Sequence, residues 1–281
     1  MPYTKRNKTF LGLISKYLPL AFWAFLVIYP LLIVVFTSFK TDEEYVKTSA
    51  FELPSNFLNF QSYITAFNQG GFTTAFLNSV ILVVVSCAVN VLLGAMTAYC
   101  LSRFDFKGKK ILTAIYILSA MVPSITLQIS IYPILKTLRL IGTMNAPLLL
   151  YIGTDIIQIW IYLQFMNKIS VSLDESAMIE GASYFRIFRT IIFPMLMPAT
   201  ATVIILKAVN VYNDMFIQHL YMSKPSLRTV TTALMVFSGD RINAQNLMMA
   251  AIVMVMIPTI LLFLSLQKYI FSGITAGAVK E

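Results

Sequence analysis

Long apolar stretches separated by short polar connections are the main pattern along the chain. Six of them approach or exceed the roughly 20 residues that a helix needs to cross a bilayer. The expected spans cover residues 18–39, 75–101, 111–135, 146–166, 191–211 and 248–267. The pattern therefore predicts an all-α, polytopic membrane protein with six transmembrane helices and one transmembrane domain over residues 1–281.

The composition supports lipid as the solvent of this chain. Of 281 residues, 58% are apolar and 12% are charged, and the mean hydropathy is +0.78. A soluble domain carries about 25% charged residues. The pI near 9.5 could indicate binding to nucleic acid, but the basic residues are dispersed at the ends of the apolar stretches, as in cytoplasmic loops. We therefore expect contact with membrane lipid and none with nucleic acid.

The distribution of lysine and arginine predicts the orientation in the membrane. With the N-terminus in the cytoplasm, thirteen basic residues of the connections and termini lie inside and seven lie outside. Cytoplasmic loops carry the excess of positive charge, so both termini are predicted to be cytoplasmic. The connection of residues 102–110 contributes most, with four basic residues in nine positions. The long outer segments 40–74 and 212–247 are expected to contact a partner or to cap a pore.

The loop after the fourth span, residues 167–190, carries signals for two short helices. Ser172 with Glu175 three residues later is typical of a capping box, so a helix should start directly after Ser172. Asp174 lies in its first turn, where the helix dipole favours an acid. Gly181 can end this helix with a positive φ, and Ser183 can cap a second one. Taken alone, the pair could simply seal the helix bundle at the membrane face.

The same loop matches a known motif. Glu175-Ser176-Ala177, three residues, Gly181, nine residues, Ile191, one residue and Phe193-Pro194 resemble the EAA loop of ABC importer permeases, E-A-A-x3-G-x9-I-x-L-P. Ser176 and Phe193 depart from the pattern by small changes. Other segments resemble the carbohydrate branch of this family, in particular the maltose-transporter G-type subunit: Asn78-Ser79 with the apolar run to Gly108, Leu227-Arg228-Thr229, and the tail from Gln267 to Lys280. The chain is thus similar to binding-protein-dependent sugar permeases.

This resemblance implies a type I ABC importer permease fold with a cytoplasmic coupling helix, in a bacterial cell membrane. In such systems two homologous permease chains form the pore. Two ATPase subunits bind ATP and Mg, and an extracytoplasmic binding protein delivers the sugar. The permease itself is no enzyme and holds no cofactor, and an oligosaccharide would be the cargo. The residues implied in coupling to the ATPase are Glu175, Ser176, Ala177, Gly181, Ile191 and Pro194. In the maltose system the other permease chain holds the sugar, so the resemblance assigns no sugar site here.

Polar residues inside the apolar spans are a second group of candidates. Asp155 lies near the middle of the fourth span, where a charge costs at least about 2.5 kcal/mol by insertion scales, and Lys207 of the fifth span could pair with it or extend toward the outer surface. One interpretation is a polar lining of the translocation path; the other is a satisfied bond between helices. Asn213 follows at the outer mouth, where sugar contact, loop capping or contact with a binding protein are open. The candidate lining residues are Asp155, Gln158, Gln128, Asn210 and Asn213.

Other function classes find less support in the sequence. Gly108-Lys109 lacks the upstream glycine of a P-loop, so ATP should be bound by a partner. His219 is the single histidine, which argues against a histidine-based metal site or a Ser-His-Asp hydrolase. Cys87 and Cys100 are about 20 Å apart on one helix and cannot pair.

A secondary carrier with Asp155 as its proton-coupling acid is the main alternative function. Such a carrier would need no EAA loop, and we detect no inverted repeat in the sequence.

Overall fold

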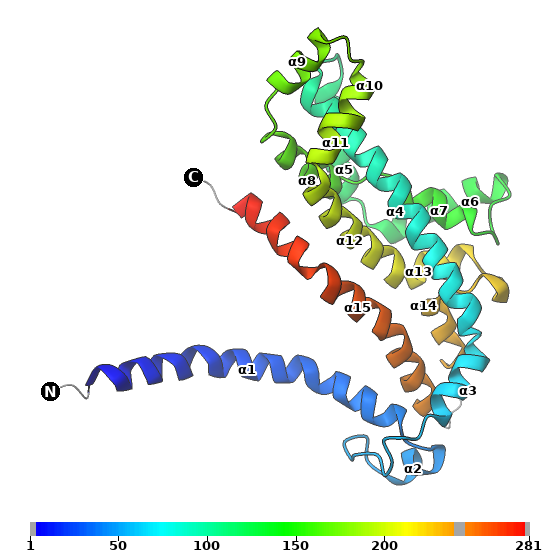
Figure 1. Ribbon diagram of the computed structural model, residues 1–281. Helices are drawn as coiled ribbons and strands as arrows, with labels where there is room; N and C mark the ends of the chain where they lie inside the picture. The colour runs from blue at the N-terminus through cyan, green and yellow to red at the C-terminus, as the bar shows by residue number, and fades with distance from the viewer. Residues whose placement is uncertain (1–3, 239–244, 279–281) are drawn as a thin grey trace. The chain divides into compact units, whose positions relative to one another are not determined.

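The computed structural model describes residues 4–238 and 245–278, which form helices and connecting loops without a β-strand (Figure 1). The prediction of an all-α membrane fold is confirmed. Two compact units are distinguished, one formed by Met1–Gly71 with Leu234–Met256 and the other by Phe72–Ala233 with Ile257–Glu281. The single transmembrane domain stays a prediction. Arg241 and Lys280, which entered the charge count and the tail resemblance, lie outside the described residues.

The first unit is organised around a buried lysine in the turn after its first helix. It contains α1 (Thr4–Ser38), α2 (Asp42–Lys47), α3 (Gln61–Gly70), the short η3 (Leu234–Val236) and the first part of α15 (Gln245–Ala278). The Nζ of Lys40 donates to Thr48 Oγ1 at 3.0 Å and to the Ser49 carbonyl at 2.7 Å. The Lys40 carbonyl accepts from Asn246 Nδ2 at 3.2 Å. This lysine therefore ties the loop after α1 to the start of α15.

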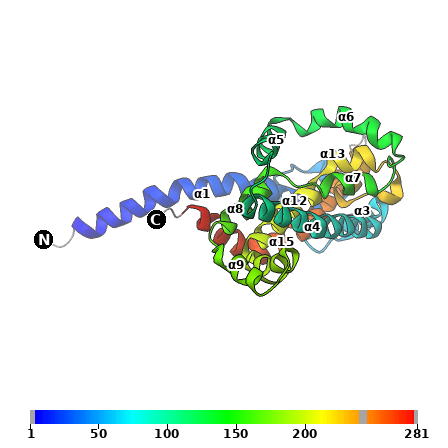
Figure 2. The ribbon, with the colours of Figure 1, turned by 90° about the horizontal axis from the view of Figure 1, so that it is seen from above.

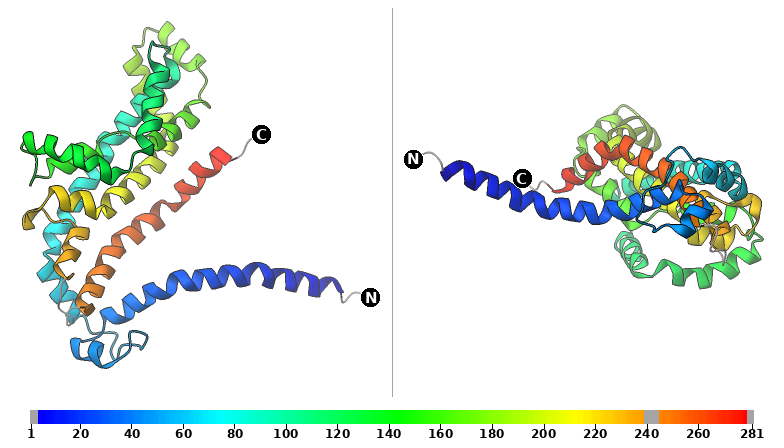
Figure 3. Two further views of the ribbon diagram at one scale, coloured as in Figure 1. Left: turned by 180° about the vertical axis from the view of Figure 1, so that it is seen from behind. Right: turned by 90° about the horizontal axis from the view of Figure 1, so that it is seen from below.

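The second unit is built around the long helix α4 (Phe72–Arg103). Its other elements are α5 (Lys109–Met121), α6 (Ser124–Thr137), α7 (Asn145–Tyr151), α8 (Ile156–Met166), α9 (Ser172–Ile179), α10 (Tyr184–Ile187), the π-helix η1 (Phe188–Ile192), α11 (Phe193–Met195), α12 (Met197–Asn213), α13 (Met215–Tyr221), η2 (Pro225–Leu227), α14 (Val230–Ala233) and the later part of α15. α4 packs against α8 and α12, and α12 runs beside it in the views from front and back (Figures 1 and 3).

Three of the six expected spans are continuous helices and three are bent pairs. Ser15–Ser38, Phe72–Arg103 and Gln245–Ser265 are each long and apolar enough to cross a membrane. The pairs α5–α6, α7–α8 and Tyr184–Met195 with α12 bend by 106°, 42° and 78°. Prolines mark two of these bends, Pro123 before α6 and Pro198 in the first turn of α12, because proline lacks the N–H that continues a helix. The α5–α6 pair curves around α7 and α13 (Figure 2).

The loop that follows α13 is fastened to the start of α4. Asn78 Nδ2 donates to the carbonyls of Ser226 and Arg228 at 3.0 and 2.9 Å. Ser79 Oγ accepts from the backbone N–H of Val230 at 3.0 Å. Asn78-Ser79 and residues 227–229, which each resemble a segment of sugar permeases, therefore contact each other.

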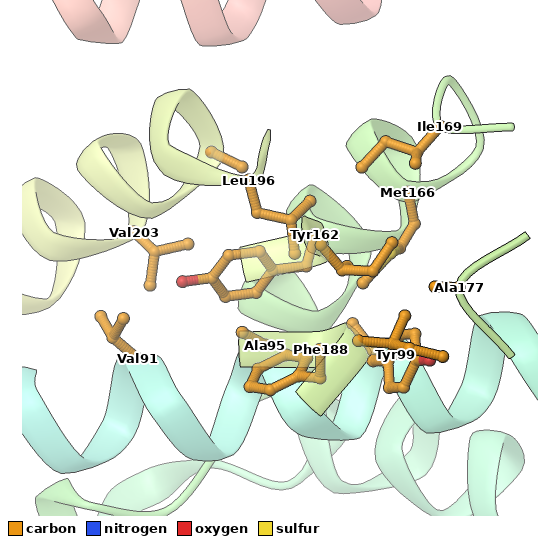
Figure 4. Packing of buried hydrophobic residues seen from close by; sticks show 14 residues of the cluster. Val91, Ala95, Tyr99, Tyr162, Met166, Ile169, Ala177, Phe188, Leu196 and Val203 are labelled. Carbon is orange, nitrogen blue, oxygen red and sulfur yellow. The ribbon is translucent and has the colours of Figure 1, made fainter. Parts of the chain in front are cut away.

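A cluster of buried apolar residues fills the space between α4, α8, η1 and α12 (Figure 4). Tyr162 lies between Val91 of α4 and Val203 of α12, and its hydroxyl donates to Thr200 Oγ1 at 3.2 Å. Alanines such as Ala95 and Ala199 are completely buried here, and small residues of this kind let membrane helices approach closely. Because the cluster extends to Ala177 of α9, it connects the bundle to the loop that carries the EAA-like motif.

Candidate functional site

The α9–α10 turn has the end signals that the sequence predicted. Gly181 has a φ of +81°, and its N–H donates to the Met178 carbonyl at 3.0 Å. The N–H of Ala182 reaches back to the Ala177 carbonyl, also at 3.0 Å. These two bonds form a Schellman motif, in which glycine supplies the left-handed residue. Ser183 then caps α10 by accepting from the Arg186 N–H at 3.4 Å.

The predicted capping box at the start of α9 is wrong. The N-cap is Val171, which makes no side-chain capping bond, and Ser172 is already helical. The Ser172 N–H donates to Ser170 Oγ at 3.3 Å, and the Ser170 carbonyl accepts from the Leu173 N–H at 3.3 Å. The chain thus begins to turn two residues before Ser172, because the hydroxyl of Ser170 satisfies the Ser172 N–H, which in a capping box would bond to the Glu175 side chain.

A buried ion pair fixes α9 to the end of α4. Asp174 is 4% exposed, and its Oδ2 accepts from Arg103 Nε at 3.1 Å. Its Oδ1 accepts from the Tyr99 hydroxyl at 3.0 Å, and Arg103 also donates to the Ile169 carbonyl at 2.9 Å. Both carboxylate oxygens and the guanidinium are therefore hydrogen-bonded, as a buried pair requires. We name this group, Tyr99, Arg103 and Asp174, the α4–α9 anchor.

Sequence reasoning assigned Asp174 only to the helix dipole and missed this anchor. The available signal was weak: Tyr99 and Arg103 are one turn apart on a helix, so they share a face. Their partner Asp174 lies 71 residues after Arg103 in the sequence, and no local sequence pattern predicts a contact over such a separation.

The EAA-like residues divide between the core and the surface. Ala177 is buried in the apolar cluster, and Ile191 packs against it. Glu175, Ser176, Gly181 and Pro194 are exposed. Large apolar side chains are exposed beside these residues: Ile179 is 88% exposed and Phe185 is 62% exposed. We name this region, residues 175–185, the α9–α10 tip. Apolar side chains that gather on an acidic and polar loop are typical of a protein-binding surface.

A cavity of about 310 Å³ with mixed polar and apolar walls lies between α4, α8 and α12. Its lining includes three of the five residues predicted for the translocation path, Asp155, Gln158 and Asn210, together with Asn90 and Lys207. Sequence reasoning did not select Asn90, although an amide near the middle of a long apolar span was a signal for it. Along α4, Asn90 lies about 27 Å from Phe72 at one end and about 20 Å from Arg103 at the other, so it is near the middle of the helix.

Gln128 and Asn213 do not line this cavity. The Nε2 of Gln128 donates to the Ser124 carbonyl at 3.1 Å, and its Oε1 accepts from the Tyr221 hydroxyl at 2.8 Å. This buried amide thus joins α6 to α13. Asn213 is the last residue of α12, and it is exposed.

Asp155 lies at the break between α7 and α8 rather than inside a continuous helix. It is the N-cap of α8, and its Oδ1 accepts from the Gln158 N–H at 2.9 Å. The break frees the carbonyls of Ile152 and Gly153, which accept from Asn90 Nδ2 at 3.5 and 2.5 Å. The helix dipole stabilises a carboxylate at this position. Within the described part of the chain, neither Asp155 nor Lys207 forms an ion pair within 4.0 Å.

Comparisons with known proteins agree with this architecture. Residues 90–275 match the family described as binding-protein-dependent transport system inner membrane component. The chain is 32% identical over 276 residues to the probable ABC transporter permease protein YurM of Bacillus subtilis, covering 98% of this chain and 91% of that protein. It is 31% identical over 255 residues to the melibiose/raffinose/stachyose import permease protein MelC of the same organism, covering 89% and 91%.

One solved structure is similar over almost its whole length. It comes from a bacterial ABC transporter involved in the import of the acidic polysaccharide alginate, with a TM-score of 0.82 and 20% identity over 96% of this chain and 99% of that one. At this identity the likeness shows the fold. The resemblance predicted from the EAA-like loop is thereby confirmed, and the chain belongs to the family of binding-protein-dependent transport system inner membrane components.

Proposed function

We propose that this chain is the permease subunit of an ATP-driven importer of sugars, in particular oligosaccharides. Family membership and the long apolar helices support a multi-pass permease. The sugar class is supported by the relative named for melibiose, raffinose and stachyose import. In this proposal the chain passes sugar from an extracytoplasmic binding protein to the cytoplasm, beside a second homologous permease and above two ATPase subunits that bind ATP and Mg.

The α9–α10 tip carries the proposal, because it combines a rigid base with an exposed end. The α4–α9 anchor and Ala177 hold the base. Glu175, Ser176 and Ile179 face away from the bundle. A force applied to this tip by an ATPase would pass directly into α4. We therefore assign ATPase coupling to this loop, with Gly181 shaping the turn and with Ile191 and Pro194 beginning the connection to α12.

The anchor also supports the orientation. Arg103 belongs to the basic connection 102–110, and its bond to Asp174 brings that connection and α9 to the same end of α4. By the excess of positive charge this end is cytoplasmic, which is the side where ATP is available.

Labelling of single cysteines tests the orientation. In a background without Cys87 and Cys100, a cysteine at Ser226 is expected to react in intact cells with an impermeant thiol reagent, whereas one at Lys107 is expected to react only after lysis. Lys107 is preferred to Gly108, whose φ of +97° a cysteine would rarely adopt. Reaction at Lys107 alone in intact cells would contradict the orientation and the coupling role of α9.

The cavity between α4, α8 and α12 supports a place on the translocation path for Asp155, Gln158 and Asn210. Non-helical backbone at membrane depth is tolerated where it is buried in protein or lines a water-filled cavity, and the α7–α8 break lies at such a cavity. An ionisable side chain inside a span likewise points to function. Gln128 and Asn213 remain predictions from the sequence without a place in this cavity.

Purification and reconstitution test the function as a whole. The tagged chain, extracted in mild detergent, is expected to copurify with a second permease and an ATPase. In proteoliposomes with the binding protein outside, uptake of labelled raffinose or maltotriose should require ATP inside and should survive a protonophore. Accumulation driven by a proton gradient in vesicles that contain only this polypeptide would contradict the proposal.

A further inference from the structure

The α4–α8–α12 cavity is bordered by two buried amides that have an unused acceptor each. Asn90 is 0% exposed and Gln158 is 3% exposed. Each uses its N–H group on a backbone carbonyl, Asn90 on Gly153 at 2.5 Å and Gln158 on Asn90 at 2.8 Å. The Oδ1 of Asn90 and the Oε1 of Gln158 have no hydrogen-bond partner among the described residues. Buried acceptors are rarely left without a donor, so these two call for an explanation.

A second buried glutamine shows that the fold can satisfy such a group. Gln128 also donates through Nε2 to a backbone carbonyl, that of Ser124, and it lies in a span of similar character. Its Oε1, however, accepts from the Tyr221 hydroxyl. Glutamine in this bundle does not by itself leave its oxygen without a partner. Of the four buried polar atoms that have none in the described chain, two lie at the cavity, and the other two are Ser86 Oγ and Asn246 Oδ1.

The charged residues of the cavity favour a neutral ligand. Asp155 on the start of α8 and Lys207 on α12 both line it, so their charges sum to zero. A carboxylate and two amide oxygens accept hydrogen bonds, while an ammonium group and the amide of Asn210 donate them. Sugar hydroxyls can do both at once. The volume of about 310 Å³ is at the lower end of the roughly 300–1,000 Å³ of ligand pockets, which suits one sugar ring.

The position of Gln158 depends on a glycine of α4. A Cβ added to Gly94 would lie 2.2 Å from Gln158 Nε2 and 2.4 Å from its Cδ. The glutamine side chain thus lies directly against the α4 backbone, where any other residue at position 94 would displace it. One hydrogen bond, to the Asn90 carbonyl, holds its amide, so a sugar that donates to the free oxygen, now covered, must turn the amide and replace that bond.

We propose that this cavity is a subsite of this chain that binds one neutral sugar ring through its hydroxyl groups. Gln158 and Asp155 accept hydrogen bonds from the sugar, and Lys207 and Asn210 donate to it. The proposal rests on the proposed function, and it adds that this permease contacts the cargo itself.

Deoxy sugars test the subsite in the assembled transporter. Wild type, Gln158→Met and Gln128→Met complexes are reconstituted with ATP inside and with binding protein saturated by raffinose, by maltotriose or by analogues that each lack one hydroxyl. Saturation removes the discrimination of the binding protein from the measured uptake rate. We expect wild type to transport the parent sugar about tenfold faster than at least one analogue, as for the loss of one buried hydrogen bond.

The glutamine variants separate a contact with sugar from a structural role. Gln158→Met should reduce this preference to less than about twofold, and Gly94→Ala should do the same by displacing the Gln158 amide. Gln128→Met should keep the wild-type preference but unfold at a lower temperature, since it leaves the Tyr221 hydroxyl without its acceptor. ATP-driven uptake with an unchanged preference in Gln158→Met would overturn the subsite alone. Absence of ATP-driven uptake of both sugars by wild type would contradict the proposed function instead.

Discussion

The α4–α9 anchor and the cavity between α4, α8 and α12 differ in whether their buried polar groups have hydrogen-bond partners. At the α4–α9 anchor, both oxygens of the buried Asp174 accept hydrogen bonds from this chain. At the cavity, the oxygens of Asn90 and Gln158 have no partner among the described residues. Buried polar groups that satisfy one another rigidify a structure, whereas an unpartnered buried group costs free energy until a donor reaches it. The anchor is thus suited to transmitting force, and the cavity to changing its contacts.

The same three helices connect both regions. α4 carries Asn90 at the cavity and Arg103 at the anchor. α8 begins beside the cavity with Gln158, and the chain after its end supplies the Ile169 carbonyl that Arg103 binds. The apolar cluster around Tyr162 lies along these helices between the two regions (Figure 4). Close-packed interiors transmit displacement rather than absorb it, so movement of α9 should reach the cavity through this cluster.

Removal of one partner of the anchor should have the largest effect. Asp174→Ala leaves the buried Arg103 guanidinium without its counter-charge, which typically costs about 3–5 kcal/mol. We expect a clear loss of thermal stability in the purified complex and loss of sugar-stimulated ATP hydrolysis.

The double variant Arg103→Met with Asp174→Leu separates these two results. Replacement of a buried ion pair by apolar residues is often neutral for stability, so the melting temperature should rise above that of Asp174→Ala. It should stay below wild type, because the Tyr99 hydroxyl and the Ile169 carbonyl lose their partners. Equal stability of Asp174→Ala and wild type would show that the pair is solvated in the assembly and would remove the contrast with the cavity.

The turn at Gly181 should have an intermediate effect. A Cβ there meets no atom within 4 Å, so Gly181→Ala should cost only the left-handed conformation, about 1–2 kcal/mol. Gly181→Asn should cost less, because asparagine adopts this conformation more readily. Gly181→Glu should still insert in the membrane but abolish sugar-stimulated ATP hydrolysis, since its side chain points out of the tip toward the proposed ATPase surface.

Stability and ATP hydrolysis must be measured on all three Gly181 variants. Full sugar transport by Gly181→Glu would contradict the coupling role of the α9–α10 tip. Equal loss of coupling in Gly181→Asn and Gly181→Glu would assign the effect to the turn itself rather than to contact with a partner.

The sequence predicted the helical fold and the turn at Gly181, because long apolar runs and a glycine after a short helix are local signals. It could not predict which face of α4 packs inward. Lipid-facing and core-facing residues are both apolar in a membrane helix, so Val91, which is buried, and Leu92, which is 47% exposed, look alike in the sequence.

Long-range polar contacts were equally hidden. The bond from Asn90 to Gly153 depends on the break between α7 and α8, and no proline marks that break. Asp155 was therefore expected inside a helix, although it caps one. Three of the predicted lining residues nevertheless meet at the cavity, since a polar side chain in an apolar span has few places other than a cavity or a partner.

Asp155→Asn should have the smallest effect, and it separates the importer from a proton-coupled carrier. Asparagine caps helices about as well as aspartate, so its oxygen can keep the 2.9 Å bond to the Gln158 N–H and still accept from a sugar. Asp155 forms no ion pair within 4.0 Å in the described chain, so the substitution breaks no direct contact with a cation. We expect ATP-driven uptake of raffinose or maltotriose within about twofold of wild type, unchanged by a protonophore.

Asp155→Leu, which removes the cap, should lose about 1 kcal/mol of stability and serves as the control. A carrier would lose accumulation with Asp155→Asn, because an amide cannot cycle a proton. Loss of accumulation in this variant, together with a protonophore-sensitive wild type, would make Asp155 a coupling acid and would leave α9 without a role in energy transfer.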